Sequence, residues 1–409
     1  MRILLLTHYY EPEIGAPQRR WRSLVDGFTA RGHEVAVIAP VSHYPHRRAS
    51  DLGGPRQLPW EWSAGVRGEQ VMRVPYAPLS GSMPGQMADQ TLSSAAAAFA
   101  ALRLRRARPD VIVSTTPGLP MPFAAAGIAR MLGAPHVAEV RDAWPDLVAD
   151  YRLVDSVTAG RLPRRLAEDA ERRWIPGLFH SALRRADALV TTAESFSAQL
   201  RARGMRRVET IRNTAETAGP APVVRVRAAG EPLRLLYVGT VGRSQGLETA
   251  IRAVSRVSGV LLRVVGAGAQ WTELRALAGQ LTDRIGFRPQ TTGPALEEHW
   301  DWADSGLVSL ADVPSFERTV PSKLVNLMAR GLHVTGVCAG EAAEIIRGAH
   351  GGHVSAPGDE DGLAGLLVRL RDDPRSTAVD GRPRQWLREH ASPQRAVEDY
   401  LTLLEEVRA

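Results

Sequence analysis

The stretch "RILLLTHYYEPEIGAPQRRWRSLVDGFTARGHEVAVIAP", residues 2–40, decides the fold. It opens with a short apolar run, continues through the turn-rich segment "EPEIGAPQRR", and then takes helical spacing up to Gly32. A second run, "HEVAVIAP", is rich in β-branched residues. Strand, loop, helix and strand within 40 residues form a βαβ unit, which requires a parallel sheet.

The same alternation continues along the first half of the chain. Further apolar runs lie at 71–76, 110–117, 136–142, 188–193 and 208–213, with helical spacing at 94–108 and 121–133. This order indicates a doubly wound sheet with buried strands. Residues 214–232 then lose all periodicity and become rich in Ala, Pro and Gly, as a linker does.

After this linker the alternation starts again. Strand-like runs and helical stretches follow one another from "LRLLYVGTVG" onward. The sequence therefore predicts an α/β protein with two Rossmann-like, doubly wound domains, 1–213 and 233–383, joined by the linker 214–232. Residues 384–409 have the spacing of one long helix. We expect that this helix can pack back across the boundary between the two domains.

Composition bounds the class of protein. Hydrophobic residues make up 44% of 409 residues and charged residues 23%, as in soluble globular proteins. The net charge of +7 suits a phosphate-bearing ligand, an anionic membrane surface or nucleic acid equally well. The single cysteine, Cys338, excludes an internal disulfide or a Cys-based zinc site, and we expect it to be buried. The N-terminal apolar run is too short for a signal peptide, and no run approaches the roughly 18 apolar residues of a membrane span. We therefore expect a cytoplasmic protein with at most peripheral membrane contact.

The segment "FERTVPSKLVNLMARG", 316–331, contains the only lysine in the chain, Lys323, and one of two asparagines, Asn326. Ser322 can cap a helix here and Gly331 can end it, which places Lys323 in the first turn. A cation is unfavourable at that end of the helix dipole unless an anion docks there. Asn326 lies one turn further on the same face, beside a phosphate or a hydroxyl-rich group. The alternative is a solvated lysine and a solvated asparagine.

A second anion site is predicted in the loop "GTVGRSQGLETAIRAV", 239–254. Gly239 and Gly242 let the backbone approach a ligand, and the following helix offers free N–H groups. Arg243 and Gln245 stand where side chains can reach a phosphate or a sugar. Glycine-rich loops of this kind are also common without a ligand.

In the first half, Gly15 follows the first strand, on the side of an open α/β sheet where ligands bind. Arg19 and Arg20 follow at the start of the helix. Arg141 and Asp142, in "EVRDAWPD", end another strand and are expected to face the same region. This pair forms either a local ion pair or an acceptor-binding and base position.

Several chemistries are disfavoured. "VVGAGAQW" only half matches a dinucleotide fingerprint, and "GDED" at 358–361 indicates a helix cap rather than a metal site. His43 and His46 lie three residues apart with no third ligand evident, so no metal is expected. Neither a nucleophile elbow nor a phosphate-loop signature is present.

These segments occur in the order found in a known family. The chain resembles glycosyltransferase family 4, which is retaining and uses nucleotide sugars on the GT-B fold, two Rossmann-like domains facing across a cleft. The segments that carry the resemblance include "HYP", "EVRDAWPD", "ADALVTTAESFSAQLRARG", "YVGTVGRSQGLETAIRAV", "PSKLVNLMARG" and "GEAAEII". Their details resemble the branch that transfers hexosamines or deoxyhexosamines in surface-polysaccharide and lipid-linked glycan assembly.

The resemblance implies that the N-terminal domain binds the acceptor and the C-terminal domain the donor, most simply a UDP-sugar. Arg243 and Lys323 would hold the diphosphate, with Gly15 approaching it from the opposite domain. The remaining donor contacts would come from Gly242, Gln245, Glu317, Ser322 and Asn326, and acceptor contacts from Arg141 and Arg19. Counting back from Gly331, the family's two glutamate positions are Arg318 and Asn326 here, and Glu317 lies one residue out of register.

The implied reaction moves a sugar from a nucleoside-diphosphate sugar to a hydroxyl of a glycan, lipid-linked or small-molecule acceptor. Arg243, Lys323 and helix N-termini would stabilise the leaving diphosphate without a metal or other cofactor. Asp142 would orient the acceptor or act as a base. A nucleotide-sugar 2-epimerase or hydrolase, and a non-catalytic sugar-nucleotide-binding homologue, are the alternatives. No nucleic-acid partner is expected. The stretch 97–108, "AAFAALRLRRAR", is a hypothesis for peripheral contact with the inner face of an anionic membrane.

Overall fold

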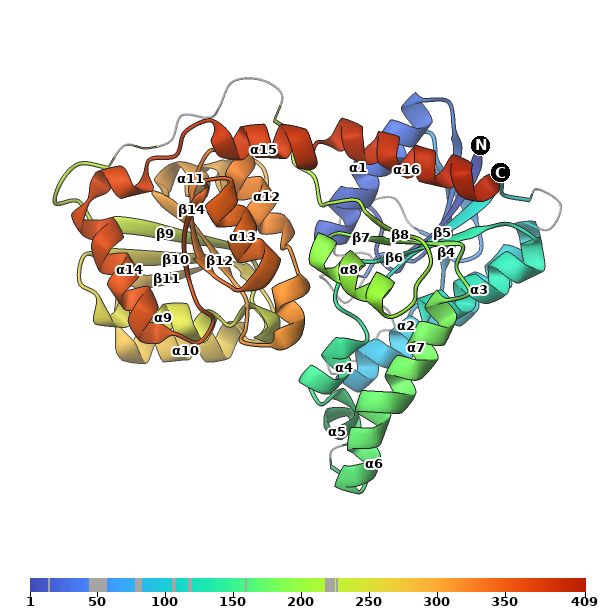
Figure 1. Cartoon of the computed structure of the whole chain (residues 1–409), viewed down its shortest axis with the longest axis horizontal. Coiled ribbons are helices and arrows are strands. Elements are labelled where there is room, and N and C mark those ends of the chain that lie inside the picture. The colour runs from blue at the N-terminus through green and yellow to red at the C-terminus, as the bar shows by residue number, and fades with distance from the viewer. Residues whose placement is uncertain are drawn as a thin grey trace. The chain divides into compact units, whose positions relative to one another are not determined.

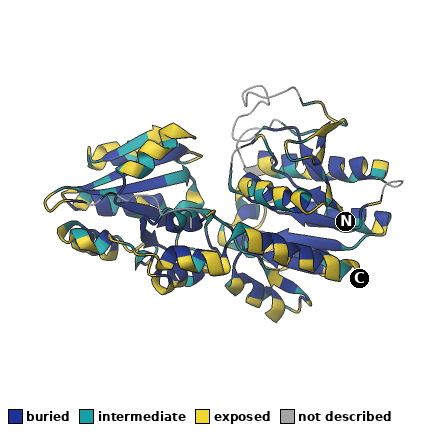
Figure 2. Ribbon diagram, turned by 90° about the horizontal axis from the view of Figure 1, so that it is seen from above, coloured by how far each residue is buried: buried dark blue, intermediate teal, exposed yellow. Residues whose placement is uncertain are grey.

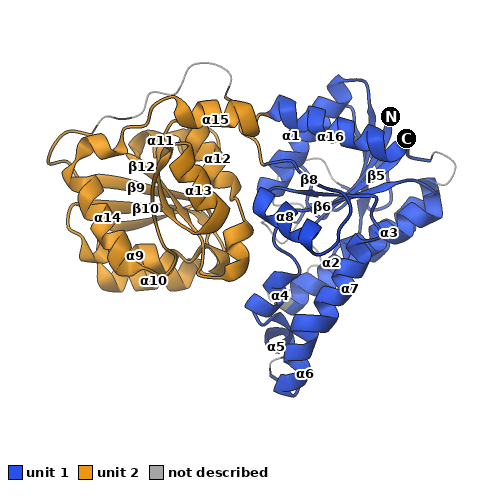
Figure 3. Cartoon of the chain, in the orientation of Figure 1, with its two compact units in different colours: residues 1–212, 393–409 blue, residues 213–392 orange. Residues whose placement is uncertain are grey.

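A computed structural model describes residues 1–13, 15–43, 57–77, 83–104, 108–116, 120–158, 160–217, 225 and 227–409. The chain forms two compact units. Unit 1 contains Met1–Arg212 and Pro393–Ala409, and unit 2 contains Asn213–Ser392 (Figure 3). His46, parts of the expected linker and residues 105–107 lie outside the described residues.

Unit 1 is built on an eight-stranded sheet with helices on both faces (Figure 1). The strand order is β3-β4-β2-β1-β5-β6-β7-β8, and all neighbouring strands are parallel except β3 and β4. The strands are β1 (Arg2–Leu6), β2 (Glu34–Pro40), β3 (Trp62–Ala64), β4 (Gln70–Val74), β5 (Val111–Thr115), β6 (His136–Val140), β7 (Ala188–Thr191) and β8 (Val208–Thr210). The helices are α1 (Ala16–Ala30), α2 (Met83–Ala101), η2 (Leu102–Leu104), α3 (Met121–Leu132), α4 (Asp146–Asp150), α5 (Leu153–Thr158), α6 (Arg164–Asp169), η3 (Ala170–Trp174), α7 (Ile175–Leu183), α8 (Glu194–Ala202) and α16 (Pro393–Arg408).

Unit 2 is built on a six-stranded parallel sheet, in the order β11-β10-β9-β12-β13-β14. The strands are β9 (Leu233–Thr240), β10 (Val260–Ala267), β11 (Ile285–Pro289), β12 (Ser305–Ser309), β13 (His333–Val337) and β14 (Gly352–Ser355). The helices are η4 (Arg243–Gln245), α9 (Leu247–Arg256), α10 (Trp271–Leu281), α11 (Pro294–Trp302), η5 (Pro314–Arg318), α12 (Ser322–Ala329), α13 (Gly340–Gly348), α14 (Glu360–Asp372), η6 (Pro374–Thr377) and α15 (Arg382–His390). Two doubly wound α/β units are thus confirmed.

The core of each unit follows from its central strands, such as β5, β6, β12 and β13, every residue of which is buried (Figure 2). In unit 1, α1 turns Trp21 and Phe28 toward the sheet, where both contact Tyr400 of α16 in edge-to-face geometry. Aromatic pairs of this kind add stability beyond their buried area. The C-terminal helix is therefore part of the unit 1 core.

The expectation of one long helix at 384–408 is wrong. The segment forms α15 in unit 2 and α16 in unit 1, with a break at Ala391 and Ser392. Pro393 explains the break, since proline has no N–H to donate and disfavours helical geometry in the residue before it.

Two smaller expectations are confirmed. Cys338 is buried. Asp359 of the "GDED" segment is the N-cap of α14, and its Oδ1 accepts the backbone N–H of Gly362 at 2.8 Å. Within the described part of the chain, no helix is both long and apolar enough to cross a bilayer.

Candidate active site

In unit 2, the strand order reverses between β9 and β12, which are neighbours at the centre of the sheet. Ligands of open α/β sheets bind outside the carboxyl ends of the strands at such a reversal. A hydrogen bond links the loops that follow these two strands: the N–H of Ala311 donates to the carbonyl of Ser244 at 3.0 Å. Apart from Gly15 in unit 1, the candidate donor-binding residues predicted from the sequence lie on these loops and on α12.

Lys323 lies in the first turn of α12 and reaches back to β9. Its Nζ donates to the Tyr237 hydroxyl at 2.6 Å and lies 3.9 Å from the centroid of that ring. The hydroxyl in turn donates to the carbonyl of Thr240 at 2.5 Å. The ammonium group is thus held at the carboxyl end of β9, beside an aromatic face that favours a cation.

Burial changes the ionisation of this lysine. Desolvation lowers the pKa of Lys323 from 10.5 to about 7, and no carboxylate forms an ion pair with it among the described residues. Lys323 is therefore expected to gain or lose its proton near neutral pH. A bound anion would favour the ammonium form and raise this pKa.

Two glycines allow the close approach of backbone in this region. Gly239 has φ +139, and a Cβ there would lie 3.6 Å from the Nζ of Lys323. Gly340, at the start of α13, has φ +59, and a Cβ there would lie only 2.0 Å from the carbonyl oxygen of Glu317. Positive φ strains any other residue, so both positions require glycine.

Arg243 and Gln245, in the loop after β9, differ in the contacts of their side chains. Arg243, the first residue of η4, is exposed, and no hydrogen bond or ion pair involves its side chain within the described residues. Gln245 instead folds back, since its Oε1 accepts the N–H of Gly242 at 3.1 Å. Arg243 is therefore available to a ligand, whereas Gln245 shapes the loop.

The expected cap of α12 is wrong. Pro321 occupies the N-cap position, no side chain caps the helix, and Ser322 is its first residue. The free N–H groups of this first turn are therefore not met by a side-chain oxygen. The expected end of the helix is confirmed, because Gly331 follows the C-cap residue with φ +65.

Asn326 and Glu317 both belong to the segment 316–331 of unit 2. Asn326 lies on α12 one turn beyond Lys323 and is half-buried, while Glu317 is exposed on η5. No hydrogen bond or ion pair is formed by either side chain within the described ranges. Both side chains remain candidates for binding the hydroxyl groups of the donor.

In unit 1, Gly15 and Arg19 lie at the start of α1. Gly15 is its N-cap, with extended backbone, and Arg19 is exposed. The neighbouring Arg20 has a different role, because it is buried and donates to Glu139 on β6 and to two backbone carbonyls. Of the two arginines, only Arg19 is open to an acceptor.

Arg141 and Asp142 follow directly after β6. The Nε of Arg141 lies 3.9 Å from an oxygen of Glu139, so this ion pair is not the local one with Asp142 that the sequence allows. Burial raises the pKa of Asp142, which the charge of Arg141 partly opposes. No hydrogen bond or ion pair of the Asp142 carboxylate exists among the described residues. A carboxylate with a raised pKa is suited to accept a proton.

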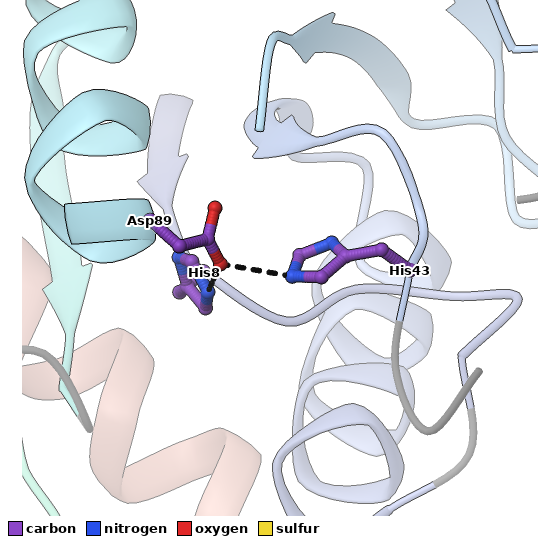
Figure 4. A group of neighbouring side chains, drawn as sticks. All are labelled: His8, His43 and Asp89. Carbon is purple, nitrogen blue, oxygen red and sulfur yellow. Dashed lines mark hydrogen bonds and ion pairs between the residues drawn. The ribbon is translucent and has the colours of Figure 1, made fainter. Parts of the chain in front are cut away.

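A cluster that the sequence did not predict lies at the carboxyl ends of β1 and β2. His8, His43 and Asp89 each place one ring nitrogen or carboxylate oxygen within 4.8 Å of the others (Figure 4). The Nε2 atoms of His8 and His43 lie 3.2 and 3.1 Å from the same oxygen of Asp89. The other Asp89 oxygen accepts the N–H of Ala77 at 2.9 Å.

A proton on His43 accounts for this geometry. Its Nδ1 lies 2.9 Å from the Val41 carbonyl, which can only accept, so Nδ1 carries a hydrogen. Its Nε2 faces the Asp89 carboxylate, which favours a second proton on the ring and so the charged imidazolium. Burial opposes that charge, but the hydrogen bonds to Asp89 and Val41 and the nearby Glu13 carboxylate outweigh it and raise the pKa of His43.

This cluster predicts a pH dependence of stability. Because folding raises the pKa of His43 above 6.5, its contribution is complete below pH 6.5 and is lost as pH rises through the folded-state value. The groups facing it are Asp89, Glu13, His8 and the stacked ring of Tyr76. We expect a charged hydrogen bond of this kind to contribute about 1–3 kcal/mol.

The measurement is the melting temperature between pH 5.5 and 9 for wild type and His43→Gln. The wild-type advantage should shrink as pH rises. The exposed His390 provides the control, since His390→Gln should follow the wild-type curve. An advantage of wild type over His43→Gln that is constant with pH would contradict a charged His43.

Sequence reasoning missed His8, Asp89 and Tyr237. His8 follows β1 and His43 follows β2. Because these strands are adjacent and parallel, the strand order could have indicated that the two histidines lie close together. Asp89 comes from α2 and Tyr237 from the interior of β9. Nothing in their local sequence marks either of them as a site residue.

Comparison with known proteins identifies the class. Residues 15–214 match the model of the glycosyl transferase 4-like domain, and residues 232–373 match that of the glycosyl transferases group 1. Together with the two doubly wound units, these matches show that the chain belongs to the glycosyltransferases with the GT-B fold. It is therefore an enzyme that transfers a glycosyl group.

Individual relatives agree with this class. The chain is 27% identical over 349 residues to WcaI of Escherichia coli (strain K12), named as a colanic acid biosynthesis glycosyl transferase, with 81% of this chain and 82% of that protein covered. Sucrose-phosphate synthase of Thermosynechococcus elongatus has the same fold at a TM-score of 0.73 and 16% identity, covering 100% of this chain and 99% of that one. HepE of Anabaena, solved with UDP-glucose, has a TM-score of 0.68 at 15% identity, covering 99% and 100%.

Proposed function

We propose that the protein is a retaining, metal-independent glycosyltransferase that takes its sugar from a nucleoside-diphosphate sugar, with a UDP-linked hexosamine or modified hexose as the preferred donor. The acceptor is a hydroxyl of a glycan, lipid-linked or small-molecule substrate. HepE, which shares the fold, is described in complex with UDP-glucose, and WcaI is named for a surface polysaccharide. These names support a UDP donor and a glycan acceptor.

One observation carries the proposal. Lys323, the only lysine, is held in the first turn of α12 at the strand-order reversal of unit 2, without a carboxylate partner among the described residues. Without an anion, this position costs dipole energy and desolvation energy. A diphosphate would offset both costs and would also meet the uncapped N–H groups of α12.

In the proposed reaction, the bond between the sugar and the diphosphate breaks, and negative charge grows on the diphosphate. Lys323, Arg243 and the N-terminus of α12 stabilise that charge. The acceptor hydroxyl attacks from the same face, and a donor phosphate oxygen takes its proton. Asp142 orients the acceptor through its carboxylate. Because these fixed cations supply the positive charge, the reaction does not depend on a metal ion.

The test begins with the donor. A panel of nucleotide sugars is screened by thermal shift, since a ligand that binds only the folded protein stabilises it by RT ln(1 + [L]/Kd). The donor that stabilises most is then incubated with the protein, with and without glycan acceptors. Transfer to an acceptor supports the proposal. Epimerised donor, or free sugar at the same rate with and without acceptor, would identify the epimerase or hydrolase alternative instead.

A further inference from the structure

Helices α4 to α7, residues 146–183, form an arm that extends from the sheet of unit 1 (Figure 1). The base of the arm is anchored. Phe179 of α7 packs against Phe123 of α3 with ring centroids 6.5 Å apart, and Asp146 of α4 pairs with Arg203 at 2.8 Å. The arm is therefore a fixed part of unit 1.

The arm is also fastened internally. Glu171, in the π-helical segment η3, is buried, and its Oε1 accepts the backbone N–H groups of Val154 and Asp155 at 2.9 and 3.2 Å. These N–H groups belong to the first turn of α5, where a carboxylate is the favoured cap. Leu153 of α5 and Ala167 of α6 are buried as well. Glu171 thus fastens the start of α5 to η3.

Large apolar side chains are exposed on this arm. Leu166, Trp174 and Leu178 are 46%, 58% and 61% exposed. Val157 and Leu162, near the end of α5 and before α6, are also exposed. Single exposed apolar residues are ordinary, but a group of this size on one projection marks an interaction site.

The π-helical segment brings three of these residues onto one face. In an uninterrupted α-helix, Trp174 and Leu178 would lie about 80° and 120° around the axis from Leu166. A π turn accommodates one extra residue, which rotates the following helix back by roughly 100°. Because Ala170–Trp174 is π-helical, Leu166, Trp174 and Leu178 form one apolar stripe.

The arm also carries exposed arginines. Arg161, Arg165 and Arg172 are exposed, and among the described residues no ion pair or hydrogen bond involves their side chains. Arg164 and Arg173 are exposed as well, and each pairs with an acidic residue of the arm, at 3.0 and 3.7 Å. Between residues 160 and 178 the arm carries five arginines against three acidic residues, of which Glu171 is buried, so this part of the arm has an excess of positive charge.

The alternative membrane-contact segment, 97–108, is less suited to docking. Ala97, Ala100 and Ala101 are buried in the core of unit 1, and Arg103 donates to the carbonyl of Trp60 at 2.6 Å. Phe99 is exposed, but its ring packs against that of Trp60. Leu102 is exposed too, but the alanine face of the segment is used inside the fold, and residues 105–107 lie outside the described ranges.

We propose that the arm docks on an anionic lipid bilayer, with Leu166, Trp174 and Leu178 entering the interface and the arginines meeting lipid headgroups. Leucine and tryptophan on one face with arginine beside them is the composition of helices that lie in a membrane interface. Tryptophan favours the headgroup level, and each arginine adds attraction to anionic lipid. This proposal concerns where the enzyme works, so it stands or falls independently of the proposed donor.

Vesicle co-sedimentation of the full chain tests the proposal without donor or acceptor. Wild type should pellet with phosphatidylglycerol-containing vesicles and remain in the supernatant with phosphatidylcholine vesicles. The triple variant Arg161→Gln, Arg165→Gln, Arg172→Gln should lose affinity by tenfold or more, on the order expected for three interfacial arginines. A variant with Trp174→Ser and Leu178→Ser should also lose binding.

A matched variant controls for net charge. Arg206→Gln, Arg275→Gln, Arg388→Gln removes three exposed arginines elsewhere in the chain and should keep wild-type vesicle binding. A second measurement uses folded wild type: brominated lipids should quench a tryptophan signal that is missing from Trp174→Phe. Failure of wild type to bind anionic vesicles, equal binding by the arm variants, or no quenching of Trp174 would overturn the proposal.

Discussion

Replacing Lys323 with alanine is expected to lower kcat/KM for glycosyl transfer by about 10²–10³-fold, the usual effect of removing one preorganised charge from a developing anion. Lys323 donates to the Tyr237 hydroxyl and has no acidic partner among the described residues. Its removal therefore leaves no buried carboxylate behind, and the fold should persist. Steady-state kinetics with the donor found in the thermal-shift screen measures the effect.

Helix α12 offers a control for this substitution. Arg330 at its C-terminal end is paired with Glu297 at 2.6 Å, away from the first turn. Arg330→Ala removes a cation near the end of the same helix and should leave kcat/KM within about twofold, because exposed pairs contribute little. Unchanged kcat/KM in Lys323→Ala would remove Lys323 from the mechanism.

Replacing Arg20 with alanine is expected to destabilise unit 1 by about 3–5 kcal/mol, since it removes the closest cation of the buried Glu139 carboxylate and leaves only the Nε of Arg141, at 3.9 Å. Glu139 is fully buried, and Arg20 contacts one of its oxygens at 2.8 and 2.9 Å. The Tyr400 hydroxyl of α16 donates to the same oxygen at 3.0 Å. The loss should therefore also loosen the C-terminal helix.

Urea unfolding measures this effect, with hydrogen exchange of α16 as a second readout. The control is Arg164→Ala, which breaks the exposed pair with Glu168 and should change the free energy of unfolding by less than about 1 kcal/mol. Similar losses in the two variants would show that the Arg20–Glu139 contact does not hold unit 1 together.

Much of the fold could be predicted because the central strands of both sheets are parallel and buried. Such strands appear in sequence as continuous apolar runs, and those at 33–40 and 136–142 coincide with β2 and β6. The antiparallel edge strand β3 was missed, since its three residues are exposed and carry no apolar pattern. The break between α15 and α16 was missed because the apolar spacing on both sides of Pro393 outweighed the proline.

The candidate site could be predicted only in part, for a physical reason. Lys323 and Arg243 are marked by chemistry that is unusual in its local context, a lone lysine at a helix start and an arginine in a glycine-rich loop. The partner of Lys323, Tyr237, lies 86 residues earlier within a strand, where a tyrosine resembles any core residue. The cation at His43 likewise depends on His8 and Asp89, which only the tertiary structure brings to it.

Because the chain has a single lysine, the proposed role of Lys323 can be tested directly. In protein labelled with ¹⁵N-lysine, one side-chain signal reports on Lys323 alone, and it should titrate near pH 7 in the free protein. A saturating nucleotide sugar should raise this pKa, because a diphosphate stabilises the ammonium form. By linkage, donor affinity should fall above about pH 7, by up to tenfold per pH unit, as binding takes up a proton. A Lys323 pKa that is the same with and without bound donor would contradict the assignment of this residue to the diphosphate.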